Sequence, residues 1–351
     1  MNIIYIELFS ILAIVLLLPF LIKKIEEEIE VFLFIMGIIA ASISSQWNVY
    51  LVKEAFIEPI KITLAVLFAG LVFNLLQKPI ADNINKITKI VGMKWFVFIV
   101  IVVLGFVSSI ITAIIASLVL VEIISYLKLD RDSEIRIVVL TCFSIGLGAA
   151  LTPIGEPLST IVIAKLKGNP YQADFFFLAR QIGYYLVPGI VTFGFIGMKL
   201  TNQHAGNRRR LHEDRKENIR DIFKRTGKVY LFVMALMFLG AGFKPLIDVF
   251  VSKLPYKGLY WINIISALLD NATLAAAEIG PGLSIIQIKA AILGLLISGG
   301  MLIPGNIPNI ISANKLKIKS SEWARFAIPL GLIFMVVYFF ILVLIPIQNV
   351  I

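Results

Sequence analysis

The chain has 351 residues, of which 59% are hydrophobic and only 15% are charged, whereas about a quarter of the residues in a soluble domain are charged. The formal net charge of +10 does not indicate a nucleic-acid partner, because the basic residues lie in short loops between apolar segments, as in membrane proteins. A single cysteine, Cys142, excludes an intramolecular disulfide and a cysteine metal cluster.

Apolar segments recur along the whole chain, and most are long enough to cross a bilayer as a helix, which takes about 20 residues. The segments lack the strict alternation of a membrane barrel, so the sequence predicts an all-α, multi-pass protein of the cell membrane. In chain order they lie near 3–22, 30–46, 57–77, 95–127, 136–165, 174–198, 229–250, 258–279, 283–314 and 324–348. The first resembles no removable signal peptide, and we expect it to be retained.

A polar stretch divides the chain into two membrane parts. Residues 199–228 hold ten Lys or Arg against four acids, and we place them in the cytoplasm. We therefore expect a first membrane repeat at 1–198, a basic cytoplasmic linker at 199–228 and a second membrane repeat at 229–351. The basic face of the linker also suits contact with anionic lipid headgroups, although a solvated helical linker is the simpler interpretation.

Segment 95–127 is too long for one crossing, because its helix would be about 50 Å long against a hydrocarbon core of about 30 Å. We predict a re-entrant hairpin here. The sequence SSIITAIIASLVL at 108–120 resembles SALLDNATLAAAE at 266–278, which predicts a second hairpin. The residues expected at the tips are Ser109 and Thr112 in the first hairpin, and Asp270, Asn271 and Thr273 in the second.

Two apolar segments are interrupted in the same way. One reads GLGAALTPIGEPLSTIVIAKLK at 146–167, and the other reads ISGGMLIPGNIPNIISANKLK at 297–317. When Gly155 is aligned with Gly305, the two sequences continue without a gap to their shared Lys-Leu-Lys. A duplicated, broken helix is typical of the substrate site of a membrane transporter.

Loop charges predict how the two halves are oriented. If each hairpin enters and leaves on one side and the linker is cytoplasmic, the inside loops hold 23 Lys or Arg and the outside loops hold 5. This asymmetry favours an inverted repeat, with one hairpin entering from each side. Four tryptophans near segment ends are expected at the membrane interface. They are Trp47, Trp95, Trp261 and Trp323.

The breaks and tips contain the residues best suited to bind an ion. Broken helices expose backbone polar groups, which a membrane tolerates only where they line a cavity or bind something. Two acids, Glu156 and Asp270, lie within apolar segments, where ionisable groups are costly and usually functional. Nearby oxygen atoms could complete the shell of a hard cation. The candidate residues are Glu156, Asp270, Asn271, Thr273, Asn306, Asn309, Ser159 and Thr160, with Na⁺ at Glu156, Asp270, Asn271 and Asn306. The simpler alternative for each acid is a hydrogen bond to a helix N-terminus.

Further polar residues are secondary candidates, together with Ser109 and Thr112. Glu122 and Glu278 lie on the return arms of the hairpins, where they either line a proton route or extend to the interface. Arg180 lies in segment 174–198. It could counter an acid of the site, bind an anionic substrate, or serve as an interfacial anchor.

In these residues the chain resembles the ion transporter superfamily, which joins sodium/proton antiporters of the NhaD type, arsenite permeases and divalent-anion/sodium symporters. It is most similar to a family of prokaryotic cation transporters of unassigned substrate. The resemblance covers nearly the whole chain. It implies an inverted repeat, with one re-entrant hairpin and one broken helix in each half. It also implies a homodimer with a scaffold domain and a moving transport domain.

The branches of this superfamily differ at the tips and breaks. In the dicarboxylate branch the tips carry Ser-Asn-Thr, and here Asp270 stands where that Ser would be, before Asn271. Glu156 follows Gly155 where the antiporter branch carries Asp. The second break keeps the residues Gly305, Asn306, Pro308 and Asn309, whereas the first tip has no Asn. Two added acids favour a cation exchanger over an anion carrier.

The leading hypothesis is a secondary transporter that exchanges Na⁺ for H⁺ by alternating access, with Glu156 and Asp270 binding either ion. It needs no cofactor besides the transported Na⁺. The alternative is a Na⁺-coupled symporter of a small anion, a carboxylate or an oxyanion. A channel fits duplicated broken helices less well. We do not expect an enzyme, because no catalytic His, Cys or nucleophile with a paired acid is visible in the membrane part.

Overall fold

The computed structural model describes residues 3–22, 28–57, 90–127, 129–201, 219–246, 254–269 and 271–344, with isolated positions between them. These residues form helices and no strand, which confirms the predicted all-α class. Asp270, residues 202–218 of the predicted linker and most of segment 57–77 lie outside the described residues.

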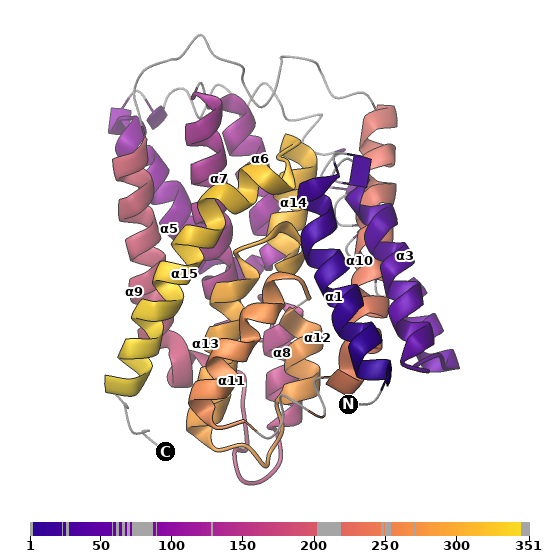
Figure 1. Cartoon of the computed structure of the whole chain (residues 1–351). Coiled ribbons are helices and arrows are strands. Elements are labelled where there is room, and N and C mark those ends of the chain that lie inside the picture. The colour runs from indigo at the N-terminus through magenta and orange to yellow at the C-terminus, as the bar shows by residue number, and fades with distance from the viewer. Residues whose placement is uncertain are drawn as a thin grey trace.

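Helices follow one another along the described chain (Figure 1). They are α1 (Ile3–Leu21), α3 (Ile29–Ile43), α5 (Met93–Ile111), α6 (Ala113–Tyr126), α7 (Arg131–Ala149), α8 (Pro157–Lys165), α9 (Phe177–Leu200), α10 (Ile219–Leu246), α11 (Tyr256–Ile262), α12 (Asn271–Glu278), α13 (Ile285–Gly299), α14 (Ile307–Leu316) and α15 (Ser320–Leu344), with 3-10 turns η2 (Asn263–Ala267) and η3 (Ile303–Gly305). Each of the apolar segments 136–165 and 283–314 therefore contains two helices. The separation falls at the Pro- and Gly-containing sequence in both.

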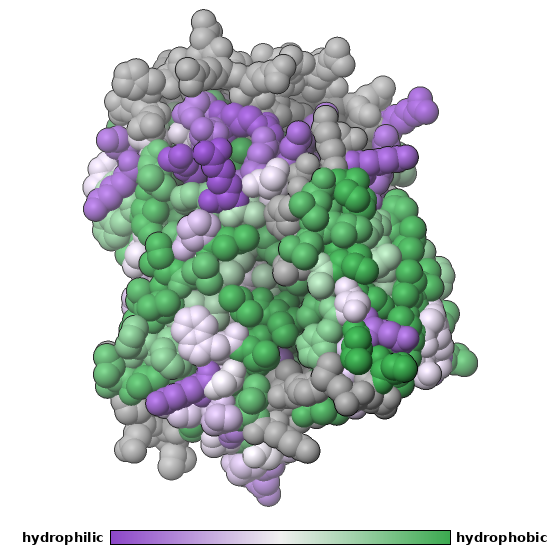
Figure 2. Space-filling view, viewed as in Figure 1, coloured by the Kyte–Doolittle hydropathy of each residue, from purple (hydrophilic) through white to green (hydrophobic). Residues whose placement is uncertain are grey.

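Four helices among the described residues are long and apolar enough to cross a membrane. They are α5, Thr226–Leu246 within α10, α9 and α15. Large apolar side chains such as Val103 of α5 and Ile333 of α15 are exposed, as on a surface that contacts lipid. Figure 2 shows hydrophobic residues over much of this face and hydrophilic residues gathered along the upper end. Together these features indicate a membrane protein.

Helices α1, α3 and α10 pack together at one side of the molecule (Figure 1). Glycines allow α3 and α10 to approach closely. A Cβ at Gly37 would lie 2.9 Å from the Ala235 carbonyl oxygen, and a Cβ at Gly242 would lie 2.5 Å from Ala40 Cβ. Small residues at a helix interface replace the hydrophobic driving force that lipid does not supply.

A second group consists of α5, α7 and α9, which contact one another. The closest approach joins α5 to α7. A Cβ at Gly148 would overlap the carbonyl oxygen of Gly105, and the Ser144 hydroxyl donates to the Ile101 carbonyl at 2.8 Å. Glycine at position 148 therefore fixes the distance between these two helices.

Four short helices pack in two pairs that connect distant parts of the sequence. Helix α6 lies against α14, and α12 lies against α8. Each pair thus joins a helix that precedes the predicted linker to one that follows it. Helix α10 contacts both α12 and α14, so the two pairs share a neighbour.

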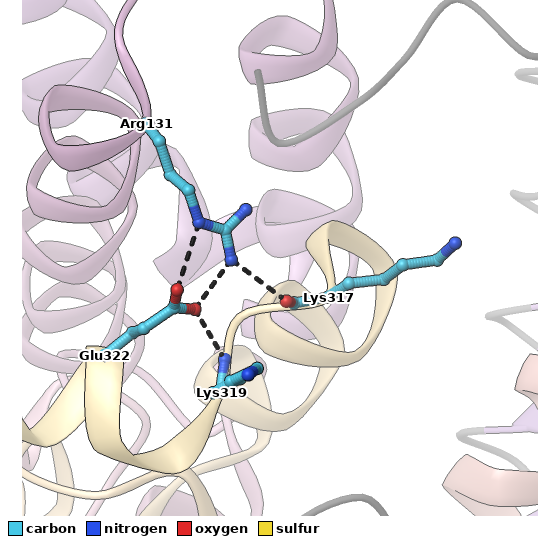
Figure 3. Close-up of polar contacts among 4 residues, drawn as sticks. All are labelled: Arg131, Lys317, Lys319 and Glu322. Atoms are coloured by element: carbon cyan, nitrogen blue, oxygen red, sulfur yellow. Dashed lines mark hydrogen bonds and ion pairs between the residues drawn. The ribbon is translucent and has the colours of Figure 1, made fainter. Parts of the chain in front are cut away.

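Charged residues connect helix ends at the upper end of the molecule. Figure 3 shows the start of α7 bound to the start of α15, where Arg131 Nη2 lies 2.6 Å from Glu322 Oε2. The same Glu322 oxygen accepts a hydrogen bond from the Lys319 backbone N–H at 3.0 Å. Lys228 of α10 pairs with Glu28 and Glu30 at the start of α3. These contacts place ion pairs at the ends of the helices, as expected where a membrane protein meets water.

The described end of the predicted linker, from Ile219 on, is helical and continues into α10. One detail differs from the sequence-based expectation. Trp323 is fully buried rather than interfacial, whereas Trp95 is 52% exposed. The indole nitrogen of Trp323 donates a hydrogen bond to the Gly300 carbonyl at 3.1 Å. This bond joins the tryptophan to the interruption between α13 and α14.

We expect Gly148→Ala to lower the free energy of unfolding by about 1–3 kcal/mol, because the added methyl group forces α5 and α7 apart. Denaturant unfolding of the purified protein in detergent measures the effect. Gly168→Ala is the control, since a Cβ there meets nothing within 4 Å. Equal stability of the two variants would contradict the close contact.

Candidate functional site

The first break separates α7 from α8 at residues 150–156. Pro157 opens α8 at a position where a missing N–H costs nothing. Gly155 lies against the end of α7, where any Cβ would overlap the Ala149 carbonyl. The Ser159 hydroxyl donates to that carbonyl at 3.2 Å. The chain therefore folds back on the end of α7 before α8 begins.

The first break is bound to the turn between α5 and α6. The Ala113 N–H donates to the Gly155 carbonyl at 2.8 Å, and the Thr152 hydroxyl donates to the Ser109 carbonyl at 2.5 Å. Thr112 between the two helices has a φ of +77°, which is unusual for a β-branched residue. These bonds hold a strained turn against the break.

The second break has the same construction at residues 300–306, between α13 and α14. A Cβ added at Gly305 would lie 2.5 Å from the Gly299 carbonyl oxygen. The Asn309 amide nitrogen donates to the carbonyls of Gly299 at 2.8 Å and Leu302 at 2.9 Å. One side chain thus binds the last carbonyl of α13, which has no helical partner, and a carbonyl within the break.

Asn271 binds the second break to the turn before α12. Its amide nitrogen faces three acceptors: the Ser266 hydroxyl at 2.6 Å, the Leu295 carbonyl at 3.0 Å and the Gly305 carbonyl at 3.2 Å. The asparagine is 2% exposed. It therefore joins the turn, α13 and the break in one buried network.

Equivalent hydrogen bonds recur in the two halves of the chain. Ser159 and Asn309, which are aligned when Gly155 is set on Gly305, both donate to the last carbonyl of the preceding helix. Ser108 donates to the Ile145 carbonyl, and Ser266 donates to the Leu295 carbonyl. These serines are aligned in the matching hairpin sequences. The repeat seen in the sequence is thus also a repeat of contacts.

The residues that open α8 and α14 have nearly the same backbone conformation. Glu156 has φ −154° and ψ 160°, and Asn306 has φ −153° and ψ 146°. Both are buried, at 7% and 6% exposure. A Cβ at Gly146 of α7 would lie 2.9 Å from the Asn306 amide nitrogen. The two aligned positions therefore differ in chemistry, carboxylate against amide, but not in geometry.

The structure gathers most of the predicted site residues in the interior. Glu156, Ser159, Asn271, Asn306 and Asn309 are all buried, and α12, which begins at Asn271, packs on α8, which begins just after Glu156. Thr160 is exposed, and its hydroxyl donates to the Pro153 carbonyl at 2.6 Å. Asp270 and the side chain of Thr273 lie outside the described residues.

One buried oxygen in this region is poised to accept a further ligand. Asn309 is completely buried, and no described residue donates a hydrogen bond to its Oδ1. Leaving a buried acceptor unpaired costs about 1–3 kcal/mol. Such an oxygen, next to a break and near other oxygen atoms, suits a hard cation.

The secondary candidates lie in three different settings. Glu122 forms a buried ion pair with Lys315 of α14. Glu278 is 6% exposed. Arg180 is exposed and lies 2.7 Å from Asp174 in the loop before α9. The hydrogen bond from Arg180 lowers the pKa of Asp174. The described partner of Arg180 is thus a carboxylate in an exposed loop.

Sequence reasoning missed two buried lysines. In the sequence, Lys315 stands out only as the end of the repeated motif. Lys289 of α13 is 3% exposed, and its ammonium donates to the Tyr184 hydroxyl at 2.9 Å. A lysine inside the apolar segment 283–314 was the available signal, because charges there are rare and usually paired.

Comparison with known proteins gives a family but no activity. A family model described as "Protein of unknown function (DUF1646)" matches residues 5–345. A search of curated proteins found no match.

We expect Asn309→Leu to lower the free energy of unfolding by about 1–3 kcal/mol, because it removes the side-chain donor to the Gly299 carbonyl and one of two donors to the Leu302 carbonyl. Denaturant unfolding in detergent is the measurement. Asn314→Leu, on the half-buried side of the same helix, is the matched control and should cost less. A loss as large in the control would show that the amide of Asn309 has no special role.

Proposed function

The chain belongs to the family described as protein of unknown function (DUF1646), and we propose that it is a secondary transporter that exchanges Na⁺ for H⁺ across the cell membrane. The observation that carries the proposal is the pair of broken helices with buried oxygen groups at both breaks. Interrupted helices at corresponding positions of two halves are the arrangement that transporters use to bind ions.

We further propose that the two halves form an inverted repeat, each with a re-entrant hairpin and a broken helix. The recurrent hydrogen bonds at the aligned serines and at Ser159 and Asn309 support this arrangement. The reciprocal packing of α6 on α14 and α12 on α8 also supports it, because a two-fold relation between halves exchanges the members of each pair. By resemblance to the wider superfamily, the transporter works as a homodimer.

In the proposed site, Na⁺ is held by carboxylate and amide oxygens. Glu156 and Asp270 supply the negative charge that a desolvated cation requires. Asn271, Asn306, Asn309, Ser159, Thr160 and Thr273 complete the set of candidate oxygens. The C-terminal ends of α7 and α13 point their last carbonyls at the breaks, which favours a cation further.

Exchange follows from competition between two ions for the same carboxylates. A protonated carboxylate no longer attracts Na⁺, and a carboxylate that binds Na⁺ cannot hold a proton. One ion therefore leaves when the other binds, and the apparent affinity for Na⁺ falls as the pH is lowered. Alternating access delivers the two ions to opposite sides.

Na⁺-coupled symport of a small anion is the second candidate. The N-terminal ends of α8 and α14 at the breaks favour it, because the N-terminus of a helix carries partial positive charge. Arg180, the cation that could have bound the anion, is exposed beside Asp174. We therefore rank symport behind exchange.

A Na⁺ gradient should move protons across liposomes that contain the purified protein and an enclosed pH dye. We expect Glu156→Gln and Asp270→Asn each to abolish this movement, because neither amide can exchange a proton for a cation. Asp174→Asn is the matched control, since this carboxylate lies in an exposed loop, and it should leave the movement intact.

Proton movement that persists in both site variants would exclude these acids as the exchange site. Na⁺ that moves no protons in the unchanged protein, together with uptake of a labelled carboxylate or oxyanion, would replace exchange with symport.

The proposed orientation predicts which loops face the cytoplasm. In a Cys142→Ala background, which removes the buried native thiol, Lys319→Cys should react with a membrane-impermeant maleimide only after permeabilisation of the cells. Gly168→Cys should react in intact cells. Labelling of both from the same side would refute the inverted arrangement.

A further inference from the structure

A buried ion pair closes the contact between α6 and α14. Glu122 of α6 and Lys315 of α14 are in contact, and their side chains are only 8% and 7% exposed. Next to the pair, Leu118 of α6 and Ile311 of α14 form an apolar cluster with Val229 of α10. Each charge neutralises the other in a region where a lone charge would be costly.

The corresponding pair of helices in the other half also contains a lysine and an acid. Lys165 ends α8 as the residue aligned with Lys315, and Glu278 ends α12, the helix that packs on α8. Glu278 is buried, and no described residue donates to its Oε2. The second pair of helices thus also has an acid on one member and a lysine on the other, with Glu278 aligned with Leu120, two positions before the residue aligned with Glu122.

The two aligned helices differ in burial. Lys315 and Ile310 of α14 are 8% and 2% exposed, whereas the aligned Lys165 and Thr160 of α8 are exposed. Helix α14 is therefore covered along this stretch, and α8 is open. The aligned helices of the two halves therefore differ in how far their neighbours cover them, and alternating access requires such an asymmetry.

We propose that Glu122–Lys315 and Glu278–Lys165 are two gates that close alternately. In this conformation the Glu122–Lys315 pair closes the route on the side of the predicted linker. When the halves exchange conformations, this pair opens into water and Glu278–Lys165 closes the opposite side. The inference rests on the proposed transport function. Ion pairs suit such gates, because their attraction is offset by the cost of desolvation and their opening is therefore inexpensive.

Accessibility of a single cysteine at Thr160 tests the proposal in the Cys142→Ala background. Its rate of labelling by an impermeant maleimide is measured from the side opposite the linker. Glu122→Gln with Lys315→Gln removes the closed gate and should slow labelling by roughly tenfold, equivalent to about 1.4 kcal/mol between the conformations. Lys165→Gln with Glu278→Gln removes the other gate and should not slow it.

A charge exchange tests the same pair in a way that does not depend on whether the neutral variants fold. Glu122→Lys alone places two like charges together and should slow labelling, whereas adding Lys315→Glu should restore the original rate. Arg131→Gln with Glu322→Gln is the matched control, because this pair (Figure 3) joins α7 to α15 away from both gates. It should leave the rate unchanged.

The result overturns the proposal if both neutral gate variants change the labelling rate in the same direction, or if the charge exchange fails to restore it. The labelling rate needs no transported ion. Normal gate behaviour without Na⁺-driven proton movement would therefore disprove the exchange of Na⁺ for H⁺ while leaving the gates in place.

Discussion

The structure depends on how the chain pairs the backbone N–H and C=O groups that lose their helical partners where a helix is interrupted. Lipid offers them no hydrogen bonds, so each must find a partner within the chain. At the first break, Ser159 donates to the last carbonyl of α7, and the Gly155 carbonyl accepts from the Ala113 N–H of the hairpin. At the second, the Asn309 side chain donates to two carbonyls. The hairpin turns are bound to the breaks through the same groups, so turn and break form one structural unit in each half.

The two units are alike in backbone and different in side chains. The residues that open α8 and α14 share their dihedral angles, yet one is glutamate and the other asparagine. A repeat that keeps its geometry while its chemistry diverges can hold one ion asymmetrically between the halves. The buried Asn309 oxygen and the Glu156 carboxylate lie in this divergent region. The proposed exchange of Na⁺ for H⁺ depends on that difference.

The sequence allowed the helical class, the positions of both breaks and the aligned residues to be predicted, because Pro, Gly and apolar length act locally. It could not predict contacts between distant helices. The partner of Glu122 is Lys315, and nothing in local pattern connects residues so far apart. Trp323 follows the usual rule for interfacial tryptophans by position, but tertiary packing buries it against Gly300. Arg180 likewise found its partner, Asp174, in a neighbouring loop.

Trp323 links the interior to the bilayer. Its indole holds the second break from one face of α15, while Ile333 and Phe340 of the same helix are exposed where lipid would lie. A helix that is longer or shorter than the surrounding hydrocarbon tilts to match it. Such a tilt would displace the indole and, with it, the Gly300 carbonyl. The thickness of the host membrane would thereby influence the geometry of the second break.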